Sequence, residues 1–121
     1  MTYLSQNHLK QTMLGGHSVE QWLEPENKGN EHILKWVCME KEPSPDSTYT
    51  VILKEVFDNG GSLLQALPVL DVDEPEGKIL SFKSSEDALK YVINELGGAL
   101  DRFVRAGDIQ QEYEKYFASK K

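Results

Sequence analysis

The chain has 121 residues, 39% of them hydrophobic, which suits one domain around one core, so we expect residues 1–121 to form a single domain. The single cysteine, Cys38, excludes an internal disulfide, and the segment MTYLSQNHLK lacks the pattern of a secretory signal, so we expect a cytoplasmic protein. A net charge of −7 disfavours nucleic-acid binding, and the absence of an apolar run of about 20 residues argues against membrane insertion.

The spacing of apolar residues in the first 24 residues predicts helix. Leu4, Leu9 and Met13 fall near one helical face, which the Gly-Gly pair at 15–16 interrupts. Ser18 then begins Ser-Val-Glu-Gln, a capping-box pattern that predicts a second short helical turn through Leu23.

Two strands are expected next, over residues 31–41 and 48–57. The first has apolar residues on both faces, which predicts a strand covered on both sides, by the N-terminal segment on one and the C-terminal helices on the other. Asp-Asn-Gly-Gly at 58–61 predicts a tight hairpin turn. Residues 63–72 would return as a third strand, at an edge or on a bulge because of Pro68, and residues 78–83 as a short fourth.

The C-terminal third predicts helices. Ser84 can cap a helix whose apolar residues repeat with helical spacing up to Leu96, and Gly97 fits its end. A brief helical piece is expected within residues 97–107, and Asp108 opens a last helix. The predicted fold class is therefore α+β: an antiparallel three- to four-stranded meander with an N-terminal helix and C-terminal helices packed on the sheet.

The charge imbalance is confined to residues 40–87, which hold eleven acids against four bases, so that 4 − 11 = −7. Four of these acids lie in one short loop: Asp71, Asp73, Glu74 and Glu76. Closely spaced carboxylates are ligands that Ca²⁺ prefers, and this loop is a candidate weak calcium site. Pro75 and Phe82 stand where an EF-hand needs other residues, so the leading interpretation is a solvated acidic loop.

No pattern in the chain indicates catalysis. His8, His17 and His32 have no zinc-ligand spacing, and Cys38 lacks the basic neighbour that activates a thiol. The glycine pairs form no phosphate-binding motif. We therefore expect a non-enzymatic protein without cofactor.

Most of the large aromatic side chains should lie in the core, and the group made by Tyr113, Tyr116 and Phe117 on the last helix is the best candidate for an exposed minority that contacts a protein partner. Arg102 and Arg105 supply too little positive charge for a nucleic-acid surface, and we expect them to pair with Asp101, Asp108 or Glu112.

The hypothesis that fits these observations best is a small acidic protein-binding domain, regulatory or adaptor in role. A basic protein partner would be attracted to Asp71, Asp73, Glu74 and Glu76, and a homodimer is a further possibility. Two alternatives remain open: a weak calcium-binding module using residues 71–77, and an inhibitor or antitoxin that mimics nucleic-acid charge.

Overall fold

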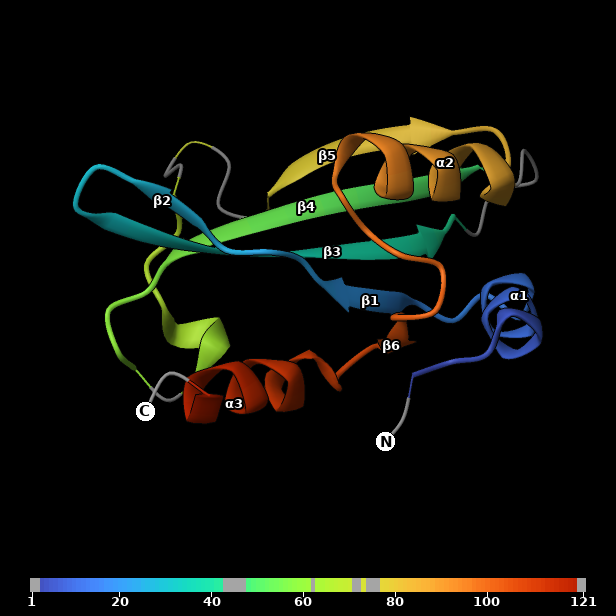
Figure 1. The fold of residues 1–121 in the computed structure, drawn as a ribbon. Helices are drawn as coiled ribbons and strands as arrows, with labels where there is room; N and C mark the ends of the chain where they lie inside the picture. Colours follow the sequence, from blue (N-terminus) through green and yellow to red (C-terminus); the bar gives the residue numbers. More distant parts are fainter. Residues whose placement is uncertain (1–2, 43–47, 62, 71–72, 74–76, 120–121) are drawn as a thin grey trace.

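A six-stranded antiparallel sheet with helices on both of its faces forms the centre of the molecule (Figure 1). The structure, a computed structural model, describes residues 3–42, 48–61, 63–70, 73 and 77–119. In chain order the elements are α1 (Gln6–Leu14), β1 (Val19–Trp22), β2 (Glu26–Lys28), β3 (Glu31–Lys41), β4 (Tyr49–Phe57), the 3-10 helix η1 (Leu64–Ala66), β5 (Lys78–Phe82), α2 (Ser85–Glu95), β6 (Val104–Arg105) and α3 (Ile109–Ser119).

The strands are ordered β5-β4-β3-β1-β6 across the sheet, and β2 also pairs with β3. The long strand β3 therefore has β4 along one side and both β1 and β2 along the other. Its second half pairs with β1, from Val19 opposite Met39 to Trp22 opposite Trp36, and its first half pairs with β2. The strands β3, β4 and β5 form an antiparallel meander in which β5 occupies the place beside β4 that was predicted for residues 63–72, and β1, β2 and β6 extend the sheet beyond the predicted three or four strands.

One face of the sheet packs against α1 and α2. Val37 and Met39 of β3 point to this face together with Val51 of β4, and they contact Leu9 from α1 and Val92 from α2 in one continuous core. Each helix begins at a serine that caps it, since Ser5 Oγ accepts from the His8 amide and Ser84 Oγ from the Asp87 amide.

The opposite face packs against α3 and η1, which lie below the sheet in Figure 1. Leu34 and Trp36 alternate with Val37 and Met39 along β3, so they point to this side and pack against Leu64, Ile109 and Tyr113. The prediction that β3 is covered on both faces is confirmed. The helices that cover each face differ from the prediction. The C-terminal helices α2 and α3 lie on opposite faces, and α1 lies on the same face as α2.

The predicted helical turn from Ser18 to Leu23 is wrong, because residues 19–22 form β1. Val19, Glu20 and Gln21 are all buried, and side chains in succession can be buried together in a strand covered on both faces. Pairing with β3 thus overrides the local capping pattern.

The predicted strand over residues 63–72 is replaced by η1 and a single β-bridge between Val56 and Val69. Leu64 and Leu67 are both buried, and their spacing of three suits a 3-10 turn better than a strand. The predicted tight hairpin at residues 58–61 is therefore not formed, because the chain returns to β4 only where the Phe57 amide donates to the Pro68 carbonyl. Residues 58–61 do bend locally: Gly60 has a φ of +84°, and its amide donates to the Asp58 carboxylate.

The predicted helical piece within residues 97–107 is also wrong. A Cβ on Gly98 would lie 2.7 Å from Cγ1 of Val92, so the chain turns tightly against the end of α2. It then runs to β6, which pairs with β1. The predicted helices that became α2 and α3 are confirmed, as are the strands β3, β4 and β5.

Candidate interaction surface

The outer strand β5 is the most exposed element of the sheet. It pairs with β4, from Leu53 opposite Lys78 to Tyr49 opposite Phe82. Within the described part of the chain, no strand lies on its other side. In an antiparallel strand alternate residues direct their N–H and C=O groups away from the neighbour, so β5 offers backbone donors and acceptors along its outer edge.

Two large apolar side chains accompany this edge. Ile79 is 53% exposed and Leu80 is 44% exposed. Ile79 lies opposite Ile52 and Leu80 opposite Val51, so the two side chains point to opposite faces of the sheet. A strand added next to β5 would therefore cover apolar surface on both faces.

A row of alternating charges crosses the sheet next to β5. Lys35 Nζ lies 2.7 Å from Glu26 Oε1 and 3.7 Å from Glu55 Oε2, and Lys78 Nζ lies 3.6 Å from Glu55 Oε1. The hydrogen bond from Lys35 holds the pKa of Glu26 below its ordinary value. Glu55 is thus neutralised by two lysines and contributes little to the negative field expected of residues 40–87.

The described acids of that region do not gather at one place. Asp58 follows the end of β4, whereas Glu42 lies beside its start, where the Glu42 amide donates to the Thr48 carbonyl. The nine residues of β4 separate these ends by about 30 Å. Glu86 and Asp87 occupy the first turn of α2. A nucleic-acid mimic requires acids along one exposed face, and that alternative stays a prediction, because Asp46, Asp71, Glu74 and Glu76 lie outside the described residues.

The acidic loop can be followed only in part. Asp73 is exposed, and Gly77, with a φ of +103°, leads into β5. Asp71, Glu74 and Glu76 lie outside the described residues, so calcium binding by this loop remains a prediction. Among the residues that are described, no group of three or more His, Cys, Asp or Glu side chains could hold a metal ion.

The aromatic group of α3 packs inward. Tyr113 is fully buried and donates its hydroxyl hydrogen to the Gly61 carbonyl, while Tyr116 and Phe117 are half-buried against the α3-side core. Trp22 contacts both tyrosine rings, with centroids 6.0 and 5.5 Å away. These side chains attach α3 to the sheet, and they are not adjacent to β5.

The histidines lie apart from one another. His32 is held on both ring nitrogens: Nδ1 donates to Asn27 Oδ1, and Nε2 accepts from the Tyr116 hydroxyl. His8 and His17 are exposed near the start and after the end of α1.

Cys38 is buried in mid-strand. Burial, and then the nearby carboxylates of Glu20 and Glu40, raise the pKa of its thiol to about 12. The thiolate that nucleophilic catalysis would need is therefore scarcely formed at neutral pH.

Sequence reasoning placed a strand at residues 78–83 but missed the importance of Ile79 and Leu80. The available signal was their adjacency, because neighbouring apolar residues in a strand point to both faces, and the last strand of a meander lies at an edge unless another strand follows it.

Comparison with models of known protein families, with curated proteins and with solved structures finds no match. Within the described residues, none of the helices has the length and apolar character needed to cross a membrane.

Proposed function

We propose that this chain is a non-enzymatic protein-binding domain that takes up an extended segment of a partner protein along the outer edge of β5. The observation that carries the proposal is a strand edge that none of the described strands covers, combined with Ile79 and Leu80 exposed on its two faces. Natural sheets usually protect such edges with charge, proline or a covering element. In β5 the charge stands at the start of the strand, at Lys78, and within the described residues no strand or helix covers the outer edge beside Ile79 and Leu80, so this part of the edge is a suitable template for an added strand.

The binding mode follows from the geometry of the strand. Backbone hydrogen bonds to β5 would supply affinity without regard to sequence, and side chains next to Ile79 and Leu80 would supply preference for apolar residues at successive positions of the partner. The partner segment would need extended backbone and no proline at positions that must donate a hydrogen bond.

Charge would add a preference for basic partners. Asp71, Asp73, Glu74 and Glu76 directly precede β5 in the sequence, so a partner strand with lysine or arginine at one end would meet opposite charge there. Attraction of this kind speeds association and is weakened by salt.

We place this binding in the cytoplasm, for which the single, unactivated cysteine is suited.

Binding is tested with short synthetic peptides in which valine alternates with lysine or with glutamate. We expect the lysine peptide to bind more tightly, with an affinity that falls as ionic strength rises, and to protect the β5 amides from hydrogen exchange. Equal affinity for both peptides would contradict the electrostatic part. Absence of protection at β5 would contradict the docking edge.

Matched substitutions distinguish binding at the β5 edge from non-specific binding to exposed apolar side chains. Ile79→Lys places a charge beside the edge and should weaken binding about tenfold. Leu63→Lys is the control, because Leu63 is 62% exposed and precedes η1 on the other side of the molecule. Reversing the four acids of residues 71–76 to lysine should remove the salt dependence while β5 remains intact. Equal losses from Ile79→Lys and Leu63→Lys would refute the β5 edge as the binding surface.

A further inference from the structure

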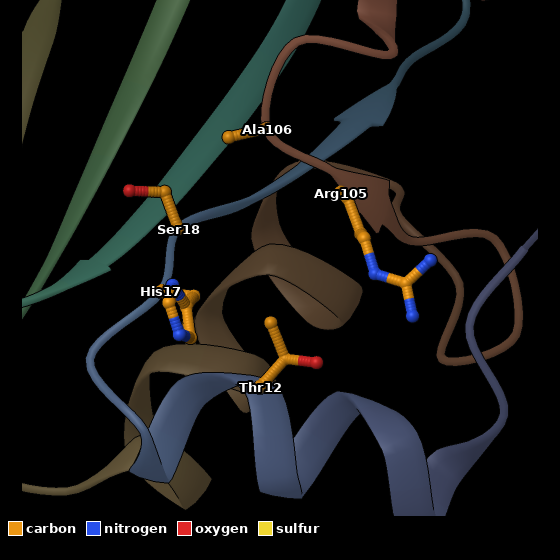
Figure 2. A pocket seen from close by; sticks show the side chains of 5 residues that line it. All are labelled: Thr12, His17, Ser18, Arg105 and Ala106. Carbon is orange, nitrogen blue, oxygen red and sulfur yellow. The ribbon is translucent and has the colours of Figure 1, made fainter.

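A pocket of about 360 Å³ lies between α1 and β6, away from the β5 edge. Thr12 of α1, His17 and Ser18 of the following turn, Arg105 of β6 and Ala106 line it (Figure 2). This volume falls within the range of small-molecule sites and is too small for a folded partner.

Backbone hydrogen bonds hold the three segments of this pocket together. The His17 amide donates to the Thr12 carbonyl at 3.0 Å, which fixes the turn after α1. The Ala106 amide donates to the Ser18 carbonyl at 3.3 Å, and Arg105 lies opposite Val19 where β6 pairs with β1. The pocket walls are therefore positioned without any ligand.

The lining of the pocket is basic and contains no acid. Figure 2 shows the Arg105 side chain extending from β6 towards α1, with the Thr12 hydroxyl directed to the side of the guanidinium. The Ser18 hydroxyl points away from it. Within the described part of the chain, no carboxylate lies within ion-pair distance of Arg105, contrary to the expected pairing with Asp101, Asp108 or Glu112, the last of which pairs with Lys115.

The carboxylate of Glu20 does not oppose this charge from within the pocket. Glu20 follows Val19 on β1, so it points to the opposite face of the sheet from Arg105. There it accepts a hydrogen bond of 2.9 Å from the Gly107 amide.

The negative end of α1 is also neutralised. The carbonyls of Gln11, Thr12 and Met13 each accept a hydrogen bond, from the amides of Gly15, His17 and Gly16 in that order. The next carbonyl, that of Leu14, accepts from Lys41 Nζ at 3.5 Å. Helix C-termini repel anions through such carbonyls when these are unpaired, and here they are paired.

From these observations we infer that the pocket binds a small ligand through an oxyanion, a phosphate or a carboxylate group. The Arg105 guanidinium provides the planar fork that pairs with two oxygens of such a group. The Thr12 hydroxyl donates to a further oxygen, and the His17 ring adds a donor from the facing turn.

The inference is tested by NMR titration of the intact chain with inorganic phosphate and, separately, with acetate at constant ionic strength. We expect saturable shifts confined to residues 12, 17, 18, 105 and 106 and the Arg105 side-chain Nε–H. Tighter binding of phosphate identifies a phosphorylated ligand, and tighter binding of acetate a carboxylate. Shifts that grow linearly and scatter over the surface with both anions would overturn the site.

Arg105→Gln and Arg102→Gln make a matched pair, because both arginines are exposed and only Arg105 lines the pocket. We expect Arg105→Gln to weaken anion binding about tenfold or more and Arg102→Gln to leave it unchanged. Thr12→Val should weaken binding less than Arg105→Gln. The unchanged amide spectrum of β6 in each variant verifies that the walls remain folded, and equal losses in the two arginine variants would refute the assignment.

Discussion

Gln21 and Ala99 form a reciprocal pair of hydrogen bonds. The Gln21 side chain donates through Nε2 to the Ala99 carbonyl at 2.9 Å and accepts through Oε1 from the Ala99 amide at 2.6 Å. Gln21 is fully buried in β1, and Ala99 belongs to the segment between α2 and β6. A side-chain amide thus takes the place of a neighbouring strand for a segment that has no regular backbone pairing of its own.

Gln21→Leu should lower the free energy of unfolding by about 2 kcal/mol or more, because it leaves both backbone groups of Ala99 without their partner. Urea denaturation measures this change. Gln11→Leu removes the same amide from an exposed position on α1 and should cost far less. Similar losses in the two variants would show that the pair contributes little.

Gly77→Ala should weaken the attachment of β5 to β4. Gly77 has a φ of +103°, and a Cβ there would lie 2.5 Å from the Leu53 carbonyl oxygen. Gly60 also has a positive φ, of +84°, but a Cβ at this position would have no atom within 4 Å. We expect Gly60→Ala to cost about 1 kcal/mol. Gly77→Ala should cost more and accelerate amide exchange in β5; equal exchange rates in both variants would contradict this.

Cys38 should resist alkylation by iodoacetamide in the folded protein at neutral pH, because burial raises the pKa of its thiol to about 12. In denaturant it should react at the rate of an ordinary cysteine. Mass spectrometry of the labelled protein measures both rates. Rapid modification without denaturant would show that this part of the sheet opens readily.

Glu20→Gln should stabilise the protein at neutral pH. Burial raises the pKa of Glu20, although the Gly107 amide and Lys54 act in the opposite direction. The folded state therefore holds this proton more tightly than the unfolded state, so the contribution of Glu20 to stability is greatest at acidic pH. It falls as the pH rises through the ordinary glutamate range towards the higher pKa of the folded state.

Melting curves recorded between about pH 4 and about pH 8 measure the effect, because this range begins near the ordinary pKa of glutamate. The gain in melting temperature of Glu20→Gln over the parent protein should grow with pH. Glu86→Gln, at an exposed position on α2, provides the control for the loss of a carboxylate that is not buried. A gain that is constant with pH would mean that Glu20 is ionised at little cost.

Local patterns predicted the elements that carry a strong period of their own. The apolar repeat and serine cap of α2 needed no tertiary information, and the alternating apolar residues of β4 identified that strand. The errors fall where a long-range contact decides. Val19 to Trp22 is a strand because β3 lies beside it, and the segment around Ala99 is not helical because Gly98 packs against Val92 and Gln21 binds it.

The candidate surface was predicted only as a region of the sequence. Residues 40–87 do contain β5, but the acids of this region that the structure describes are dispersed, and Glu55 is paired with Lys35 and Lys78. Exposure of Ile79 and Leu80 depends on which strands lie next to β5, and no local pattern contains that information. The same holds for Arg105, whose freedom from Asp101 and Asp108 follows from the position of β6.

The alternation of Leu34, Trp36, Val37 and Met39 between two cores has a consequence for strand register. A slip of β3 by one residue would exchange the contents of both cores and turn Lys35 towards α3, so burial on each face opposes it. β5 has exposed residues on both faces, and burial restrains its register through Phe82, which packs against the α2-side core and the Tyr91 ring. Its alignment depends further on the close approach of Gly77 to Leu53 and on the Lys78–Glu55 ion pair. The strand to which we assign partner binding is thus the one most able to adjust its alignment to the segment it receives.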